Sequence, residues 1–214
     1  MSCFPMFVEL KNRPCLVVGG GQVALRKIKV FTDFGAQVQV VAREILPEIF
    51  EMEHVVCKQR CFEEKDLNGQ QFVVVATDDM ELNHRVSMAC KKEKIPVNVV
   101  DRPSECSFIF PAYLKEGEVV AAFSSGGQSP VVTQYLKEQI RPVMTNLLGE
   151  LAACLGNLRE SVQQCPETRA AGKKIYREIL QLSLEKDRVP SQDEIERIIR
   201  KYREREIEWN GRED

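Results

Sequence analysis

The chain has 214 residues, of which 43% are hydrophobic and 29% charged, and its formal net charge is -2. This length allows one or two domains with a substantial core, and the nearly balanced charge argues against a protein that wraps nucleic acid or lies on an anionic membrane. The sequence lacks a transmembrane-length apolar stretch and a secretory leader pattern, so we expect a cytoplasmic protein that binds a small molecule.

Five short apolar runs rich in Val and Ile occupy the first half of the chain. Such runs are typical of strands buried on both faces of a parallel sheet. The segments between them include stretches with apolar residues at helical spacing. Alternating strands and helices imply right-handed crossovers, so we predict an α/β fold with a doubly wound parallel sheet of the Rossmann type. The runs are 15–18, 38–41, 55–57, 72–76 and 97–100.

A glycine-rich motif joins the first predicted strand to the helix after it. Gly19-x-Gly21-x-x-Ala24 matches the dinucleotide-binding fingerprint, in which glycines allow a tight turn and close approach of a pyrophosphate. Free N–H groups at the helix start, near Gln22 and Val23, favour phosphate binding. The alternative is a turn that only joins two elements, but the strand before it and the helix after it favour the cofactor.

The second predicted strand is expected to end in an acidic residue that holds the ribose hydroxyls of NAD. Here Ala42 is followed by Arg43 and only then by Glu44. Arg43 could bind the 2′-phosphate of NADP, or it could be an exposed loop charge while Glu44 or main-chain groups hold the ribose. The sequence therefore leaves both NAD and NADP open.

Polar residues follow the fourth and fifth predicted strands, at the sheet edge where ligands bind. Thr77 is a candidate cofactor contact, and the aspartates after it favour helix capping. Asp101 is a candidate general base, with an ordinary turn residue before Arg102 as the alternative. Asn98 either faces a ligand cleft or is a satisfied buried amide.

The pattern changes after residue 101. Residues 108–114 and 119–123 flank a Gly-containing turn and predict two antiparallel strands. Ser129-Pro130 predicts a helix start with Ser as the cap and Pro in the first turn. The remainder has helical character, and the segment from Ser191 to Glu194 has the form of a capping box.

Five blocks follow one another along the sequence: residues 17–27 (VVGGGQVALRK), 76–83 (ATDDMELN), 98–101 (NVVD), 108–111 (FIFP) and 124–130 (SSGGQSP). Together they resemble the precorrin-2 dehydrogenase family, the dehydrogenase and ferrochelatase part of siroheme synthase. The resemblance implies NAD-dependent oxidation of precorrin-2 to sirohydrochlorin by a stand-alone form, with insertion of ferrous iron by some members. An NAD-binding regulatory module without catalysis is the alternative function.

The resemblance also implies a domain organisation. We predict an NAD-binding Rossmann domain over residues 1–112, a small α+β segment over residues 113–146 that forms a homodimer, and a helical domain over residues 147–214. The helical domain would help to form the tetrapyrrole cleft, although the sequence assigns no substrate contact after residue 167.

The polycarboxylate nature of the implied substrate suggests a role for the loop 124–130, which leads into a helix N-terminus. We expect Ser125, together with Arg102 or Lys115, to contact its acetate or propionate groups, with an ordinary capped helix as the alternative. Ser125 could also be phosphorylated. The two histidines, His54 and His84, and the scattered cysteines form no metal-binding pattern. Iron insertion would then use the tetrapyrrole nitrogens, with Asp101 as the proton acceptor.

Overall fold

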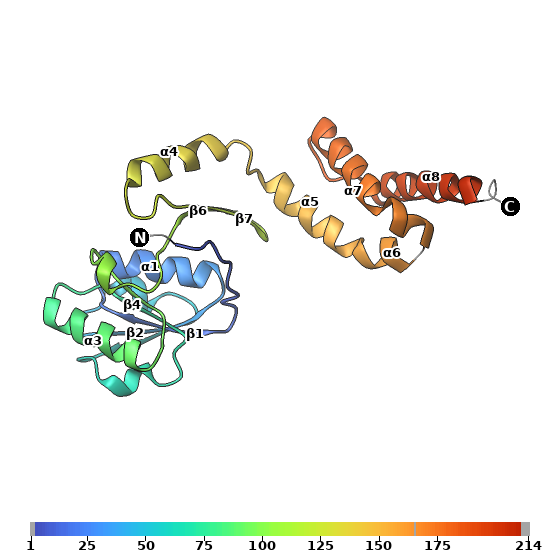
Figure 1. Ribbon diagram of the computed structural model, residues 1–214. Helices are drawn as coiled ribbons and strands as arrows, with labels where there is room; N and C mark the ends of the chain where they lie inside the picture. Colours follow the sequence, from blue (N-terminus) through green and yellow to red (C-terminus); the bar gives the residue numbers. More distant parts are fainter. Residues whose placement is uncertain (1–2, 165, 211–214) are drawn as a thin grey trace. The chain divides into compact units, whose positions relative to one another are not determined.

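A computed structural model describes residues 3–164 and 166–210 of the chain. The chain divides into two compact units, Met1–Phe110 and Pro111–Asp214 (Figure 1). The first unit holds a parallel sheet, and the second combines a short antiparallel hairpin with helices. In the described part of the chain no helix has both the length and the apolar content to cross a membrane.

The first unit is built on a five-stranded parallel sheet with the order β3-β2-β1-β4-β5. β2 and β3 lie on one side of β1, and β4 and β5 lie on the other. Neighbouring strands are parallel, so crossovers connect them, and the predicted doubly wound Rossmann-type sheet is confirmed. All five apolar runs of the sequence form strands: β1 (Pro14–Val18), β2 (Gln37–Ala42), β3 (Val55–Gln59), β4 (Phe72–Val75) and β5 (Val97–Val99).

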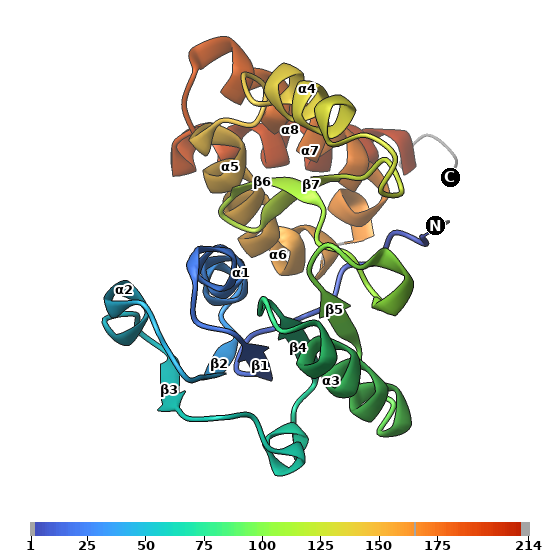
Figure 2. The ribbon, with the colours of Figure 1, turned by 90° about the vertical axis from the view of Figure 1, so that its left-hand side faces the viewer.

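Alternate residues of the sheet build two hydrophobic cores. On one face Val17, Val40 and Val74 pack with α1 (Gln22–Asp33), and on the other Val73 and Val75 pack with α3 (Met80–Lys92). Figures 1 and 2 show these two helices on opposite sides of the sheet. Such two-sided burial explains why the strands are continuous apolar runs rather than alternating ones. The unit also contains α2 (Pro47–Phe50) and two short 3₁₀ helices, Glu64–Leu67 and Pro103–Glu105.

The segment after β5 differs from the prediction. The strand expected over residues 108–114 begins only at Ala112, as β6 (Ala112–Glu116). The rings of Phe108 and Phe110 instead pack into the core beside α1: Phe110 lies 5.4 Å from Phe31, and Phe108 lies 5.5 Å from Phe72, between ring centroids. Aromatic burial on the sheet thus prevails over strand pairing for this segment, and Pro111 lacks the N–H that a ladder needs.

The second unit starts with the hairpin of β6 and β7 (Val119–Phe123), whose turn contains Gly117 at φ +59°. Ser129 caps α4 by accepting a hydrogen bond from the Val132 N–H at 3.3 Å, as predicted. The capping box also forms: the Glu194 N–H donates to Ser191 Oγ at 3.4 Å, and the Ser191 N–H donates to Glu194 at 2.8 Å. The helices are α4 (Pro130–Ile140), α5 (Asn146–Asn157), α6 (Arg159–Gln164), α7 (Pro166–Lys186) and α8 (Gln192–Asn210).

A third hydrophobic core holds the helices of the second unit together. It includes Leu151 of α5, Ile175 and Ile179 of α7, and Ile195 of α8, all of them at most 2% exposed. Leu151, Ile175 and Ile179 lie on stripes of apolar residues at helical spacing in the sequence, and the structure buries these faces of α5 and α7. The break between α5 and α6 was not predicted, although Gly156 at the end of α5 is a residue that disfavours a continuous helix.

Candidate functional site

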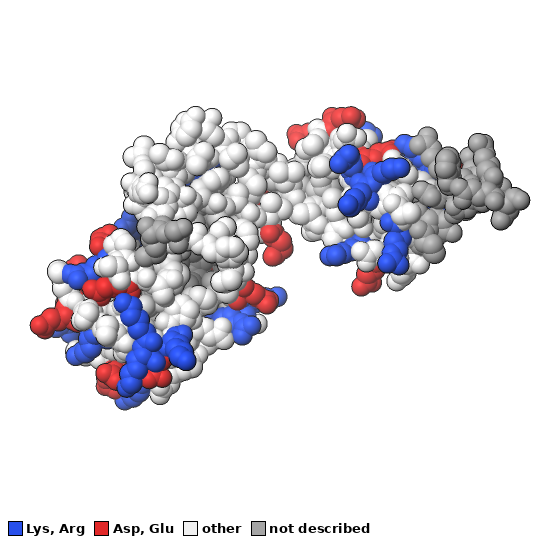
Figure 3. Space-filling view, in the orientation of Figure 1, with Lys and Arg blue, Asp and Glu red and all other residues white. Residues whose placement is uncertain are grey.

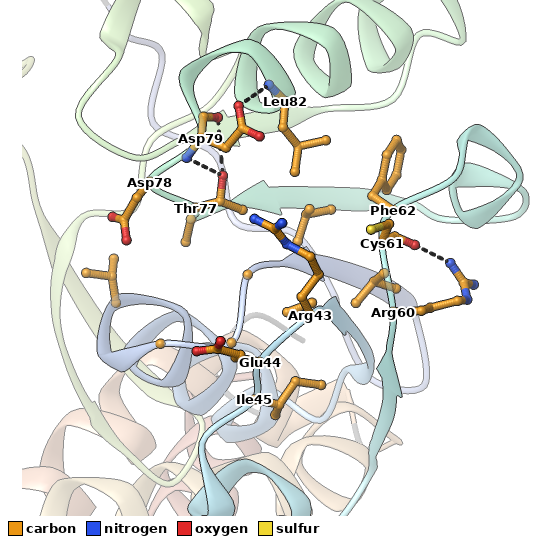
Figure 4. A pocket seen from close by; sticks show the side chains of 18 of the residues that line it. Arg43, Glu44, Ile45, Arg60, Cys61, Phe62, Thr77, Asp78, Asp79 and Leu82 are labelled. Carbon is orange, nitrogen blue, oxygen red and sulfur yellow. Dashed lines mark hydrogen bonds between the residues drawn. The ribbon is translucent and has the colours of Figure 1, made fainter.

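A cavity of about 1200 Å³ lies at the carboxyl ends of the strands in the first unit (Figure 4). Ligands of open parallel sheets bind at this edge, where the crossovers on either side of β1 diverge. The glycine turn after β1, the loop after β2, the end of β3 and the turn between β4 and α3 form its walls. The cavity brings together all the predicted cofactor residues: Gly19, Gly21, Gln22, Val23, Arg43, Glu44 and Thr77.

The three consecutive glycines of the turn meet different surroundings. A Cβ built on Gly19 would lie 2.2 Å from the Ala76 carbonyl oxygen, and the φ of Gly19 is +126°. On Gly20, a Cβ would lie 2.2 Å from the carbonyl oxygen of Glu44. A Cβ on Gly21 would meet nothing within 4 Å. The chain itself therefore requires the first two glycines, whereas Gly21 leaves open space in the cavity.

Gly20 is a residue that the sequence reasoning missed, since the dinucleotide fingerprint leaves its position variable. Its carbonyl oxygen also accepts a hydrogen bond from the Leu46 N–H at 3.0 Å, so the loop after β2 is hydrogen-bonded to the glycine turn and lies too close to Gly20 for a side chain there. The only hint in the sequence was the run of three glycines where the fingerprint needs two.

The geometry of the turn fits the diphosphate of a dinucleotide. Gly21 is the N-cap of α1, and among the described residues no side chain caps this helix. The first N–H groups of α1 are therefore available to an anion, and they lie beside the open space at Gly21. A bare backbone next to a helix N-terminus is what a pyrophosphate group requires.

The loop after β2 carries opposite charges into the cavity. In Figure 4 the Arg43 side chain points across the cavity toward Thr77, while the Glu44 carboxylate lies on the opposite side. Within the described part of the chain, Arg43 has no carboxylate partner. Arg60, which also lines the cavity, is held by Asp66 with one N–O distance of 2.7 Å. Of these two guanidinium groups, the one of Arg43 can therefore bind a ligand without breaking an ion pair.

Replacing Arg43 with Ala tests the two interpretations of this residue. If Arg43 contacts a 2′-phosphate, we expect the variant to lose about tenfold in NADP affinity and little in NAD affinity, because one charge-assisted contact is removed. Calorimetric titration with both cofactors measures this, with Arg60→Ala as the matched control. An equal or negligible change for both cofactors would identify Arg43 as a loop charge only.

Hydrogen bonds from its own polar side chains stabilise the turn between β4 and α3. Asp79 Oδ1 accepts a hydrogen bond from the Leu82 N–H at 2.9 Å, which confirms the predicted capping role. The Thr77 hydroxyl lies 2.6 Å from Asn83 Oδ1 and accepts a hydrogen bond from the Asp79 N–H at 3.2 Å. Since the hydroxyl of Thr77 already stabilises this turn, its contact with a cofactor stays a prediction.

Asp101 follows β5, the neighbour of β4 in the sheet, and does not line the cavity itself. The residue is exposed and has a φ of +59°, in the left-handed region where Asp and Asn are tolerated better than other side chains. This conformation is compatible with a turn residue and with a catalytic carboxylate at the sheet edge. The role of Asp101 therefore stays a prediction at this point.

The loop around Asp101 is fixed by several buried contacts. Asn98 is 8% exposed and donates a hydrogen bond from Nδ2 to the Phe108 carbonyl at 3.0 Å, which favours the buried-amide interpretation over a substrate contact. The Val99 N–H donates to Cys106 Sγ at 3.2 Å. Sequence reasoning missed Cys106, because a single cysteine gives no signal for such a role. The amide and the thiol together hold the two ends of the loop.

Arg102, a predicted substrate contact, is engaged by a neighbouring carboxylate. Its Nη1 donates to Glu105 Oε1 at 3.1 Å, and His84 Nδ1 lies 3.5 Å from the same oxygen. Burial alone would raise the pKa of Glu105, but the charges and hydrogen bonds of Arg102 and His84 outweigh it and lower that pKa. A substrate carboxylate would therefore have to compete with Glu105 for Arg102.

Ser125 lies in the second unit, in the loop before α4. Its hydroxyl donates to the Ser129 carbonyl at 3.0 Å and accepts from the Ser129 N–H at 2.9 Å. Gly126 and Gly127 follow at φ +64° and +83°. The hydroxyl thus stabilises the loop, and binding of a substrate carboxylate by Ser125 stays a prediction.

Comparisons with known proteins agree with the geometry of the cavity. Residues 6–112 match the model of a family described as "Putative NAD(P)-binding". The siroheme synthase of Methylococcus capsulatus is 40% identical over 174 residues, which are 79% of this chain and 37% of that protein. The siroheme synthase of Nitrosospira multiformis is 36% identical over 188 residues, 85% of this chain and 40% of that one. The chain thus spans about two fifths of the length of these relatives.

The structural comparison extends over both units. A solved structure titled "SirC, precorrin-2 dehydrogenase" is similar, with a TM-score of 0.77 and 26% sequence identity. The similarity covers 94% of this chain and 100% of that one.

Proposed function

Because this chain belongs to the NAD(P)-binding family whose model it matches over residues 6–112, we propose that it is an NAD-dependent oxidoreductase that converts precorrin-2 into sirohydrochlorin. The observation that supports the substrate most directly is the likeness to a precorrin-2 dehydrogenase over nearly the whole of both chains. Since the siroheme synthases are much longer than this chain, the proposal concerns the oxidation step alone.

In this proposal the first unit binds the cofactor. Gly21 and the N–H groups at the start of α1 would hold the diphosphate, and the residues after β2, Arg43 and Glu44, would meet the adenosine ribose. NAD, when bound, supplies the acceptor for a hydride. The fit rests on the bare backbone at Gly21, where the cavity would admit a diphosphate and the protein itself leaves the space open.

Asp101 provides the acid–base chemistry in this proposal. Oxidation of a reduced tetrapyrrole removes a hydride and a proton, and the proton needs an acceptor close to the reacting carbon. Asp101 follows β5, adjacent to the strand that ends at the cavity, and its side chain is exposed to an incoming substrate. Its carboxylate would take the proton as the hydride leaves.

One assay tests the proposed function. Protein, precorrin-2 and NAD are mixed anaerobically, and the growth of NADH absorbance is expected only when all three are present. Tight NAD binding without any absorbance change would favour the alternative, a regulatory module that senses the cofactor.

In the described residues we find no group of three His, Cys, Asp or Glu side chains that could hold a metal ion. Insertion of ferrous iron stays a prediction, which sirohydrochlorin and ferrous iron without NAD would test.

We also propose a homodimer formed through α4. Exposed apolar side chains gather on one face of this helix, and Figure 3 shows a surface without Lys, Arg, Asp or Glu over this part of the chain. A contiguous apolar face of this kind marks an interaction site, and most soluble oligomers pair identical surfaces about a two-fold axis. The face consists of Val131, Val132, Tyr135, Leu136 and Ile140, with Val143 just beyond the helix.

Placing a charge on this face tests the dimer. Tyr135, 58% exposed, lies at the middle of the face, and Tyr135→Glu is expected to weaken association at least about tenfold because a buried unpaired charge would result. Sedimentation equilibrium of wild type and variant measures the association constant. Gln134→Glu adds the same charge to the other side of α4 and serves as the control. Equal association constants for both variants and wild type would place the contact elsewhere.

A further inference from the structure

Asn83, the fourth residue of α3, is a buried amide outside the roles assigned so far. It is 6% exposed, and both polar atoms of its side chain meet Thr77. Its Nδ2 lies 2.9 Å from the Thr77 carbonyl oxygen, and its Oδ1 lies 2.6 Å from the Thr77 hydroxyl oxygen. Buried amides are ordinarily hydrogen-bonded, and here one neighbouring residue provides both partners.

The carbonyl group of Thr77 determines which way this amide is oriented. A carbonyl oxygen only accepts hydrogen bonds, so the Asn83 atom beside it must be the nitrogen, which donates. The amide oxygen of Asn83 therefore faces the Thr77 hydroxyl. Since an amide oxygen carries no proton, the hydroxyl donates its single proton to Asn83 Oδ1, at a distance near the short end of the range for such bonds.

The other groups around the Thr77 hydroxyl agree with this direction. The Asp79 carbonyl oxygen lies farther away, at 3.3 Å, and already accepts the main-chain N–H of Asn83 at 2.9 Å. The Asp79 N–H donates to the Thr77 hydroxyl oxygen at 3.2 Å. A hydroxyl group has one proton and two lone pairs. The proton and one lone pair of Thr77 are thus in use, and one lone pair remains for a ligand.

Thr77 is half-buried and lines the cofactor cavity (Figure 4). We propose that Asn83 is a positioning residue that makes the Thr77 hydroxyl a hydrogen-bond acceptor only, so that this wall of the cavity binds a donor group of the cofactor and none of its phosphate oxygens. The inference rests on the proposed function, because it takes the ligand to be a pyridine dinucleotide. Ribose hydroxyls and the amino groups of adenine and the carboxamide donate hydrogen bonds, whereas phosphate oxygens accept them.

The direction of the hydroxyl can be measured without a ligand. A hydroxyl proton held by a buried amide oxygen exchanges slowly with water, and proton NMR detects it; Thr77→Val identifies the resonance by its loss. In Asn83→Leu, which fills the space but offers no acceptor, we expect exchange to be at least about tenfold faster. Ser87→Ala is the matched control, because it removes another buried hydrogen bond of α3, to the Glu105 carbonyl. It should leave the exchange rate within about twofold of wild type.

Two results of this measurement would overturn the inference. One is equal exchange of the Thr77 hydroxyl proton in Asn83→Leu and wild type. The other is a wild-type Thr77 hydroxyl proton that exchanges as fast as that of an exposed threonine, and this result does not depend on the folding of any Asn83 variant. Circular dichroism and urea unfolding of each variant separate a loss of stability from a change at the hydroxyl.

Calorimetry with ligands tests the selectivity. Thr77→Val keeps the shape of the side chain without the hydroxyl, and we expect it to lose about fivefold to tenfold in NAD affinity, whereas Thr77→Ser stays within about twofold of wild type. Inorganic pyrophosphate, whose oxygens accept hydrogen bonds, should bind equally to Thr77→Val and wild type. An equal loss of affinity for pyrophosphate and NAD would show that the hydroxyl donates to phosphate, which overturns the inference.

A series of ligands locates the donor group. ADP contains the adenosine donors, ADP-ribose adds the second ribose, and NAD adds the carboxamide. The smallest ligand that binds Thr77→Val more weakly than wild type contains the group that donates to Thr77. Equal affinities of all three ligands for Thr77→Val and wild type overturn the inference.

The same experiments separate the inference from the proposed function. NAD binding that depends on Thr77 as expected, in a protein that never produces NADH from precorrin-2, upholds the inference and overturns the oxidoreductase. A wild-type protein that binds NAD and forms NADH, but has a rapidly exchanging Thr77 hydroxyl, upholds the proposed function and overturns the inference. A wild-type protein that binds none of the three ligands overturns both.

Discussion

Replacing Asp101 with Asn is expected to leave NAD affinity unchanged and to slow precorrin-2 oxidation at least about a hundredfold, the lower end of what a positioned base contributes. The amide has the shape of the carboxylate but cannot accept the proton. Asn also tolerates the left-handed conformation that Asp101 adopts at φ +59°, so the turn is preserved. Stopped-flow recording of NADH formation and calorimetry with NAD give the two quantities.

A matched control exists at the neighbouring strand. Asp78→Asn removes an exposed carboxylate that lines the cavity after β4, and turnover should stay within about twofold of wild type because this group has no assigned proton to accept. Near-normal turnover of the Asp101 variant would remove the catalytic role and leave Asp101 as a turn residue. A similar loss in both variants would point to a general electrostatic effect of the cavity.

Gly21→Ala is expected to reduce NAD affinity at least about tenfold without lowering the free energy of unfolding. The backbone of Gly21 is extended, at φ -89° and ψ -171°, and a Cβ there meets nothing in the protein within 4 Å. The same methyl group would occupy the space that a diphosphate needs. Calorimetry with NAD and urea unfolding measure the two effects separately.

Gly20→Ala is the contrasting variant. Its Cβ would lie 2.2 Å from the Glu44 carbonyl oxygen, so the loop after β2 must move and we expect the free energy of unfolding to fall by about 1–3 kcal/mol. Unchanged NAD affinity in Gly21→Ala would mean that the diphosphate does not lie against this turn, and the cofactor part of the proposed function would then fail.

The sheet and the helix starts could be predicted because local patterns determine them. Each apolar run is long enough to identify a strand, and the caps of α3 and α4 depend on residues at most three positions apart, as between Asp79 and Leu82. The cofactor turn was predictable for the same reason, since its glycines and the flanking strand and helix are contiguous. All the predicted cofactor residues therefore meet at one cavity.

The features that could not be predicted depend on contacts between distant segments. Gly20 is required because the loop after β2 lies against it. The residues next to Gly20 in the sequence do not indicate this contact. The sequence predicts Phe108 to be part of a strand, but in the structure its ring is buried beside Phe72.

The attachment of the loop after β2 to Gly20 has a consequence for the divergence of cofactor preference. Since the Leu46 N–H and the Glu44 carbonyl both lie against the glycine turn, the main-chain path through residues 43–46 is set by the same turn that would receive the diphosphate in the proposed function. Insertions or deletions in this loop would damage both halves of the nucleotide site at once. In the proposed function, the choice between the two pyridine nucleotides would then be changed by exchanging side chains at positions 43 and 44 on an unchanged backbone.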